Sequence, residues 1–368
     1  MYLVFRQWKR IFICGFIGLS ALLTRPYLSN ADEISTLETP ETPTITYHQE
    51  ARWQEIGGDY QSFNQPCDVA IDHRGHIYIA DCTLRVVFKF DGTGKLLSVW
   101  TGSPDIRFAH PASIAIDVND VYVVDRYASR VFHFDLEGTF KDLWRLRDSE
   151  EGEVSEALGI CNNPLGRIYI ADHNRDRINS YDSEGQFISS FGDKAEDKAK
   201  LFGPTDLICD ADGNILTISF NDHLVKFASD GSVLGTWGDN GNKIGQFDDA
   251  RGLAIDSQGN IYVADTENGR IQRFDAKLIN SPPSKDSKAK APSTDQLAAQ
   301  ITVWGQDPKA GTVLRKPTGI AVMTNGIVIV TDQLDGSVTL WKPISSVPPQ
   351  PTTPTPPSPS PSPEATAD

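Results

Sequence analysis

The sequence predicts an all-β fold built from one repeated unit of short strands. Six apolar segments recur along the chain, and all except the fourth end in aspartate. They are Ile77–Asp81, Val121–Asp125, Ile168–Asp172, Ile215–Ser219, Ile261–Asp265 and Ile327–Asp332. Counted between their last residues, the spacings are 44, 47, 47, 46 and 67 residues. A period in this range is typical of repeat architectures such as propellers and solenoids.

Three further strand signals accompany each segment. An inner strand precedes it across a tight turn, and an alternating strand follows it, as the hairpins of an antiparallel sheet require. A fourth strand ends in an aromatic residue in five units: Trp100, Trp144, Phe191, Trp237 and Trp304. Four antiparallel strands repeated around an axis form a β-propeller, and counting the units predicts six blades.

The last unit lacks a fourth strand. After its third strand, Ser337–Trp341, the chain reaches Pro343 and then a proline-rich stretch. Near the start, Arg52–Gly58 has the pattern of a fourth strand without a blade of its own. We therefore expect this N-terminal strand to complete the sixth blade and close a ring that spans residues 52–343. The polar stretch at about 281–299 is expected to be a disordered insertion in the ring.

The two ends have the compositions of an export signal and a disordered tail. Three basic residues precede an apolar run over 11–23, and Ser29–Ala31 offers a small-x-small cleavage site, which predicts a signal peptide over 1–31. The apolar run is shorter than the roughly 20 residues that span a bilayer as a helix, although an uncleaved N-terminal membrane anchor is an alternative. Residues 32–51 are then a linker, and 344–368 a Pro/Ser/Thr-rich tail. We expect an exported protein, either periplasmic or secreted.

The composition is acidic. The formal net charge is −15, and 49 acidic residues outnumber 34 Lys and Arg residues. Such a surface repels phosphate backbones and anionic lipid head groups, so we do not expect nucleic acid as a partner. We expect a monomer, with no transmembrane domain once the signal peptide is removed.

One repeat carries a specific family resemblance. Residues 251–275, RGLAIDSQGNIYVADTENGRIQRFD, resemble the NHL repeat, whose pattern runs Pro-x-Gly-[Ile/Val]-Ala-[Ile/Val]-Asp, Gly-x-[Ile/Val]-Tyr-Val-Ala-Asp and Asn-x-Arg-[Ile/Val]. The likeness extends over about residues 52–342, and weakens in the third and fourth units. It implies an exported, bacterial-type NHL-repeat propeller. Propellers of this kind host lyases, hydrolases, ligand sensors and interaction platforms, so the fold does not fix the function.

The aspartates that end the apolar segments have two interpretations. A circle of carboxylates is able to hold a cation. Alternatively, each aspartate accepts hydrogen bonds from its own turn and lies near an arginine of the next strand, such as Arg130, Arg177 or Arg270. Because the residue repeats with the blade, we favour the second interpretation.

The resemblance also raises one enzyme family, the peptidyl-hydroxyglycine amidating lyases. These six-bladed propellers hold a catalytic zinc with three histidines at the starts of inner strands. The corresponding positions here are Cys67, Ala112, Leu158, Thr205, Arg251 and Thr318. A catalytic zinc needs about three converging ligands, and only His110 and His173 are expected near this face. We therefore do not expect the zinc lyase chemistry.

A calcium-dependent hydrolase of the gluconolactonase or paraoxonase type is a second enzyme possibility. Calcium binds several oxygen ligands, and Asp68 and Asp206, with Asn162 or Asn163, are placed to point into the channel. The Glu, Asn and Asp order of that family is missing, so we expect no cofactor and retain channel calcium as an alternative. Arg251 stands alone at the channel mouth, where it binds an anion or pairs with a nearby Asp.

Four cysteines follow the predicted signal peptide. In the first blade the hairpin turn makes Asp72 face Ile77, which places Cys67 opposite Cys82 and permits a disulfide there. An oxidising compartment favours such a bridge, and two buried thiols are the alternative. Cys161 and Cys209 lie on neighbouring inner strands, one place out of step, so we expect their side chains to face opposite ways as small core residues.

Together these observations favour a binding module. The loops before the inner strands and after the second strands form one face, which we expect to bind a protein, peptide or glycan. The candidate residues on this face are Asp68, His110, His173, Asp206 and Arg251, and no catalytic or metal-binding residue is assigned. The alternative is a metal-dependent lyase, or a lactonase- or esterase-type hydrolase, with its site at the central channel.

Overall fold

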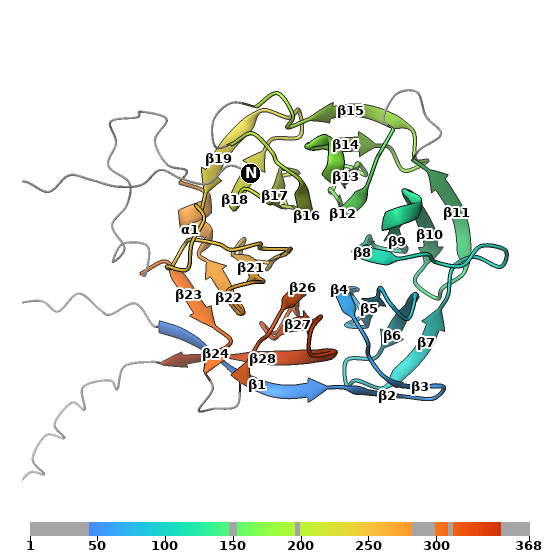
Figure 1. Cartoon of the computed structure of the whole chain (residues 1–368), viewed down its shortest axis with the longest axis horizontal. Helices are drawn as coiled ribbons and strands as arrows, with labels where there is room; N and C mark the ends of the chain where they lie inside the picture. The colour runs from blue at the N-terminus through green and yellow to red at the C-terminus, as the bar shows by residue number, and fades with distance from the viewer. Residues whose placement is uncertain (1–43, 147–152, 196–198, 282–298, 308–311, 347–368) are drawn as a thin grey trace, which may run out of the picture. The chain divides into compact units, whose positions relative to one another are not determined.

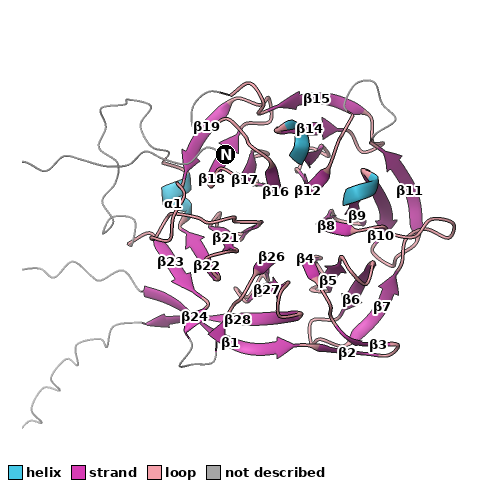
Figure 2. Ribbon diagram, in the orientation of Figure 1, coloured by secondary structure: helices cyan, strands magenta, loops and turns pink. Residues whose placement is uncertain are grey.

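The computed structural model describes residues 44–146, 153–195, 199–281, 299–307 and 312–346. Six four-stranded antiparallel sheets are arranged around a central channel, which confirms the predicted six-bladed β-propeller (Figure 1). The described residues contain short helical segments, among them α1 (Ala276–Ile279) and two turns at Arg126–Ala128 and His173–Arg175 (Figure 2). The predicted signal peptide, most of the insertion and most of the tail lie outside the described residues.

The strands follow the predicted order from the channel outward. Blade one contains β4 (Pro66–Ile71), β5 (Ile77–Asp81), β6 (Val86–Phe90) and β7 (Leu96–Trp100). Blade two contains β8 (Pro111–Ile116), β9 (Asp120–Asp125), β10 (Arg130–Asp135) and β11 (Phe140–Arg145). Blade three contains β12 (Ala157–Asn162), β13 (Ile168–Asp172), β14 (Arg177–Tyr181) and β15 (Phe187–Phe191). Blades four and five contain β16 (Pro204–Cys209), β17 (Ile215–Ser219), β18 (His223–Phe227), β19 (Val233–Trp237); and β20 (Gly252–Ile255), β21 (Ile261–Asp265), β22 (Arg270–Phe274), β23 (Ile301–Trp304). Two small hairpins, β2 (Glu55–Gly57) with β3 (Tyr60–Ser62) and β24 (Gln306–Asp307) with β25 (Thr312–Val313), lie outside the blades.

The sixth sheet is composed of β26 (Pro317–Val322), β27 (Val328–Asp332), β28 (Ser337–Ser346) and β1 (Thr44–Trp53). Its outer strand begins at Thr44, before the expected start at Arg52. Residues 44–51, which were expected to belong to a linker, are therefore part of this strand. The reason is that β28 continues through Pro343, whereas β27 pairs with it only as far as Trp341. Beyond that point β28 pairs on one side only, where a proline without an N–H is tolerated.

The core lies between neighbouring blades, where the sheets pack face to face. The cluster between blades one and two, for example, joins Tyr78 and Val87 to Phe132 and Phe134, all almost fully buried. The second strands of all six blades are buried along their length, except for Asp120 at the start of β9. This burial on both faces explains why these segments read as continuous apolar runs.

Five of the six inner strands carry a β-bulge near their first residue. In β4 the register shifts between Pro66 and Asp68, and in β16 between Pro204 and Asp206, so that one extra residue is inserted in each. A bulge bends the strand and re-aims the side chains beside it. The bulges thereby set which side chains of the inner strands face the channel.

Candidate ligand-binding channel

The repeated aspartates are structural. Asp81, Asp125 and Asp265 are fully buried, and their carboxylates accept hydrogen bonds from backbone N–H groups in the loop before the inner strand of the same blade. The distances are 2.8 Å from Asn64, 2.9 Å from Ala109 and 2.9 Å from Asp248. Asp125 and Asp265 also pair with arginines of the next strand. Their oxygens are therefore committed to the scaffold rather than to a central cation.

Two other aspartates, Asp68 and Asp206, line the narrow part of the channel. They occupy equivalent places after the bulges of β4 and β16, in blades one and four, which lie opposite each other in the ring. One oxygen of Asp68 accepts the N–H of Val69 and the other the N–H of Ile114 in the next blade, both at 2.8 Å. Asp206 repeats this arrangement with Leu207 and Leu253, also at 2.8 Å. Each carboxyl group therefore ties two blades together at the channel.

The two carboxyl groups titrate abnormally. Burial raises the pKa of Asp68 to about 6, although hydrogen bonds from Ile114, Val69 and Ser113 oppose the shift. Burial together with repulsion by Asp68 raises the pKa of Asp206 well above its ordinary value. Burial thus disfavours the ionised form of both carboxyl groups, and the charge of Asp68 adds to this effect at Asp206.

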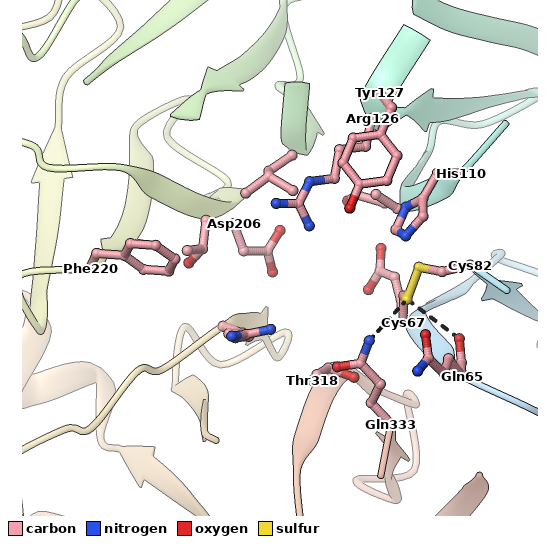
Figure 3. A pocket seen from close by; sticks show the side chains of 16 residues that line it. Gln65, Cys67, Cys82, His110, Arg126, Tyr127, Asp206, Phe220, Thr318 and Gln333 are labelled. Carbon is pink, nitrogen blue, oxygen red and sulfur yellow. Dashed lines mark hydrogen bonds between the residues drawn. A yellow bond between two sulfur atoms is a disulfide. The ribbon is translucent and has the colours of Figure 1, made fainter. Parts of the chain in front are cut away.

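A cavity of about 260 Å³ opens above these aspartates. All six blades contribute to its wall, and Figure 3 shows the side chains that line it. A second cavity of about 290 Å³ lies at the other end of the channel and shares Asp68, Ser113 and Asp206 with the first. The two carboxyl groups therefore form the neck between the two cavities. We call the first cavity the channel pocket.

Two arginines lie in the wall of the channel pocket, on opposite blades. Arg126 follows β9 in blade two, and its Nε donates to Glu156 at 2.5 Å. Arg251 precedes β20 in blade five and pairs with Asp249 at 2.7 Å, the pairing foreseen as one of its two roles. Figure 3 shows the guanidinium group of Arg126 pointing into the pocket. Neither arginine lines the second cavity, so both lie closer to the mouth than the aspartates.

Aromatic side chains form the rest of the rim. Tyr127 and Phe220 line the channel pocket and are 57% and 44% exposed. The ring of His110 packs on Tyr127 with the centroids 4.6 Å apart, and burial, together with the charge of Arg126, lowers the pKa of His110. His173 does not line the pocket. Its ring packs against Phe220 at 4.6 Å, and its Nδ1 lies 3.3 Å from the carbonyl oxygen of Pro204.

The structure thus brings together four of the five expected residues: Asp68, His110, Asp206 and Arg251. His173 is held outside by Phe220. Arg126, Tyr127 and Phe220 were not predicted as site residues, although all three directly follow the end of a second strand. That position, one or two residues beyond the repeated aspartate or serine, is the signal that would have found them.

Two disulfides border the channel. Cys67 and Cys82 are joined within blade one, with Cα atoms 5.9 Å apart, and both line the channel pocket. Cys161 and Cys209 are joined between blades three and four, with Cα atoms 5.8 Å apart. The expectation that the second pair would not meet was wrong. Neighbouring blades pack face to face, so side chains on opposite faces of their own sheets point toward each other.

The described residues supply only part of each metal site considered above. Within the described ranges no three His, Cys, Asp or Glu side chains gather as metal ligands. The described residues that line the channel pocket include one histidine, His110, where the zinc site would need three. Asn163 is buried and bonded to its own hairpin turn, and Asn162 lines the second cavity instead. Asn162 thus lines the same cavity as Asp68 and Asp206, but the carboxylates of both aspartates already accept backbone N–H groups.

The fold is a six-bladed propeller, and one segment of the chain matches the NHL repeat. The family model for the NHL repeat matches residues 247–274. A probable peptidyl-α-hydroxyglycine α-amidating lyase from Caenorhabditis elegans is 36% identical over 83 residues, which cover 20% of this chain and 23% of that protein. The protein brain tumor of Drosophila melanogaster is 28% identical over 129 residues, 34% of this chain and 12% of that protein. Both alignments span less than a quarter of the relative.

Solved structures show the same fold over most of the chain. Virginiamycin B lyase from Staphylococcus aureus superimposes with a TM-score of 0.51 at 13% identity, over 81% of this chain and 99% of the lyase. A Bacteroides thetaiotaomicron protein of unknown function gives a TM-score of 0.59 at 12% identity, over 82% and 77%. At this level of identity the likeness establishes the propeller alone. No helix in the described part of the chain is long and apolar enough to cross a membrane.

Proposed function

We propose that this chain is an exported propeller that binds a protein, peptide or glycan through the face on which the channel pocket opens. The observation that carries the proposal is the coincidence of this pocket with exposed apolar side chains. Besides Tyr127 and Phe220, Phe202 is 61% and Leu334 54% exposed, and both lie in loops on the same edge of the blades. Exposed apolar side chains that gather on one face of a protein mark recognition surfaces.

The geometry of the pocket supports recognition rather than covalent chemistry. The two sulfurs in its wall are joined to each other, and the two aspartates use both oxygens to bond the inner strands. The arginines are oriented by their own carboxylate partners. Rigid strands that present charged and aromatic groups to an open pocket are the arrangement expected of a binding site.

The proposal is tested by probing the full chain on peptide and glycan arrays. The double variant Tyr127→Ala/Phe220→Ala removes aromatic groups from the pocket face. Val118→Ala/Leu165→Ala is the matched control, since these residues are 65% and 77% exposed in turns at the opposite edge of the blades. We expect the first variant to lose binding and the second to keep it. Equal signals from both variants would overturn the proposal.

A metal-dependent lyase or hydrolase is the second candidate, and the similarity to the amidating lyase favours it. Elemental analysis of the untagged protein, purified from its native compartment without chelators, separates the two functions. Stoichiometric zinc or calcium would support the enzyme. Metal-free protein that remains folded and still binds its array ligand would support the binding module.

A further inference from the structure

We infer that the channel pocket selects a small zwitterion of amino-acid or dipeptide size, bound with its ammonium group between Asp68 and Asp206 and its carboxylate at Arg126 and Arg251. The inference rests on the proposed binding function and specifies its ligand. It follows from the order in which the charged groups lie along the channel. The carboxyl groups lie at the neck, and the guanidinium groups lie toward the mouth.

The neck is suited to a cation. Asp68 and Asp206 approach from opposite blades, and their mutual repulsion is one of the causes of the raised pKa of Asp206. Each carboxylate oxygen accepts one backbone N–H in the contacts above, whereas a carboxylate offers about four lone-pair positions. An ammonium group has three donors and a full positive charge. Placed between the two carboxyl groups, it relieves their repulsion and fills the remaining acceptor positions.

The mouth is suited to an anion. Glu156 engages only the Nε of Arg126, and neither Nη of this side chain has a hydrogen-bond partner among the described residues. Asp249 engages Nε and Nη2 of Arg251, which leaves its Nη1 without a partner in the same set of residues. Guanidinium edges of this kind bind carboxylates with directed, charge-assisted hydrogen bonds. The two arginines enter the wall from opposite blades, and in the proposed pose both serve the carboxylate of the ligand.

The dimensions restrict the ligand further. A volume of about 260 Å³ lies just below the range of drug-sized pockets, which begins at about 300 Å³. The pocket therefore suits an amino acid or a short peptide and excludes a folded partner from its floor. Leu158 and Phe220 add apolar surface to the wall of the pocket, against which a short aliphatic linker packs. A ligand with only one of the two charges leaves either the two carboxyl groups or the two guanidinium groups without an opposite charge from the ligand.

The test is isothermal titration of the full chain with diglycine, alanylalanine, β-alanine and γ-aminobutyrate. N-acetyl-diglycine lacks the ammonium group, and glycinamide lacks the carboxylate. We expect at least one zwitterion to bind at least tenfold more tightly than both blocked analogues, a difference of about 1.4 kcal/mol. Asp206→Asn and Arg126→Gln should each weaken the binding of that zwitterion at least tenfold. Asp206→Asn should also reduce the preference for the zwitterion over N-acetyl-diglycine, and Arg126→Gln should reduce the preference over glycinamide.

Arg175→Gln is the matched control. Arg175 follows the second strand of blade three as Arg126 follows that of blade two, and it pairs with Glu153 at 2.8 Å, but it does not line the pocket. Its substitution should leave the affinity unchanged. Blocked analogues that bind as tightly as the zwitterions would overturn the inference. So would the absence of binding by every zwitterion up to about 10 mM, which is weaker than ordinary recognition. If array binding persists in that case, the proposed function stands and only its ligand is wrong.

Discussion

At the scale of the residue, the repeated aspartate is a buried hub for polar contacts. Asp265 accepts hydrogen bonds from the backbone of Asp248 and the side chains of Asn268 and Gln272, and its Oδ2 lies 2.6 Å from Nε of Arg270. Arg270 is itself 5% exposed. Removing the carboxylate leaves a buried guanidinium group without its counter-charge, which is among the most destabilising of single changes.

We therefore predict that Asp265→Ala lowers the free energy of unfolding by about 3–5 kcal/mol. Blade four supplies the control, because Ser219 holds the equivalent position and its hydroxyl bonds only Asn221, at 2.6 Å. Ser219→Ala should cost about 1 kcal/mol, the usual value of one neutral hydrogen bond. Urea denaturation followed by fluorescence measures both. Equal losses would show that the aspartate acts only through its local turn.

Asp68 predicts a pH dependence of stability. Its pKa in the folded chain, about 6, lies above the ordinary value of 3.8, so the folded state binds this proton more tightly than the unfolded state. Stability from this group is therefore full below about pH 4 and is lost as the pH rises to about 6 and beyond. Asp68→Asn should flatten this part of the profile. A series of melting temperatures from acid to neutral pH checks it, and parallel profiles for both proteins would contradict it.

At the scale of the element, outer-strand aromatics pack onto glycines of the next blade. Gly94, Gly138 and Gly185 each have a positive φ in the turn between third and fourth strands, and each lies against the indole of Trp53, Trp100 or Trp144 respectively. Trp53 belongs to β1, so it takes the place in blade six that Trp100 takes in blade one. This contact is why the sequence shows a recurrent aromatic residue followed, in the next unit, by a recurrent glycine.

Gly185 and Gly166 form a matched pair for testing this contact. Both have a φ of 77°, but a Cβ on Gly185 would lie 2.5 Å from Trp144, whereas a Cβ on Gly166 would meet nothing within 4 Å. We predict that Gly166→Ala costs about 1 kcal/mol through its left-handed backbone. Gly185→Ala should cost a further 1–3 kcal/mol or so, because Trp144 must move. Thermal or urea unfolding of the two variants gives the difference, and equal costs would contradict the packing argument.

At the scale of the whole molecule, the ring depends on contacts between blades that have no shared backbone ladder. The Cys161–Cys209 disulfide is a covalent contact of this kind, and it links residues 48 positions apart. Cys67–Cys82 links residues 15 apart within one blade. Tyr47 of β1 adds a non-covalent contact, stacking on Trp304 of blade five at 4.0 Å.

The longer loop should give the larger stabilisation. From the entropy of the unfolded chain we predict a loss of about 4 kcal/mol for Cys161→Ala/Cys209→Ala and about 3 kcal/mol for Cys67→Ala/Cys82→Ala. Peptide mapping after alkylation, with and without reductant, first establishes both pairings in protein from the native compartment. Chemical denaturation of the two double variants then tests the order, and a smaller loss for the inter-blade pair would contradict it.

The sequence by itself determined the all-β class, the six units, the order of strands in each unit and the structural aspartates. These features depend on local patterns: apolar alternation, turn residues and one hydrogen-bonded register within each blade. The single-sided pairing of β28 beyond Trp341 was not visible in this way, because Pro343 resembles a strand end.

Only the tertiary structure decided which side chains meet across blades. It placed Arg126 and Phe220 in the channel pocket, excluded His173 and joined Cys161 to Cys209. Neighbouring blades contact each other through side chains rather than through paired strands. The periodicity of the sequence therefore does not predict how one blade is positioned against the next. The bulges at the starts of β4 and β16 then turned Asp68 and Asp206 toward the axis, and strand alternation alone does not reveal a bulge.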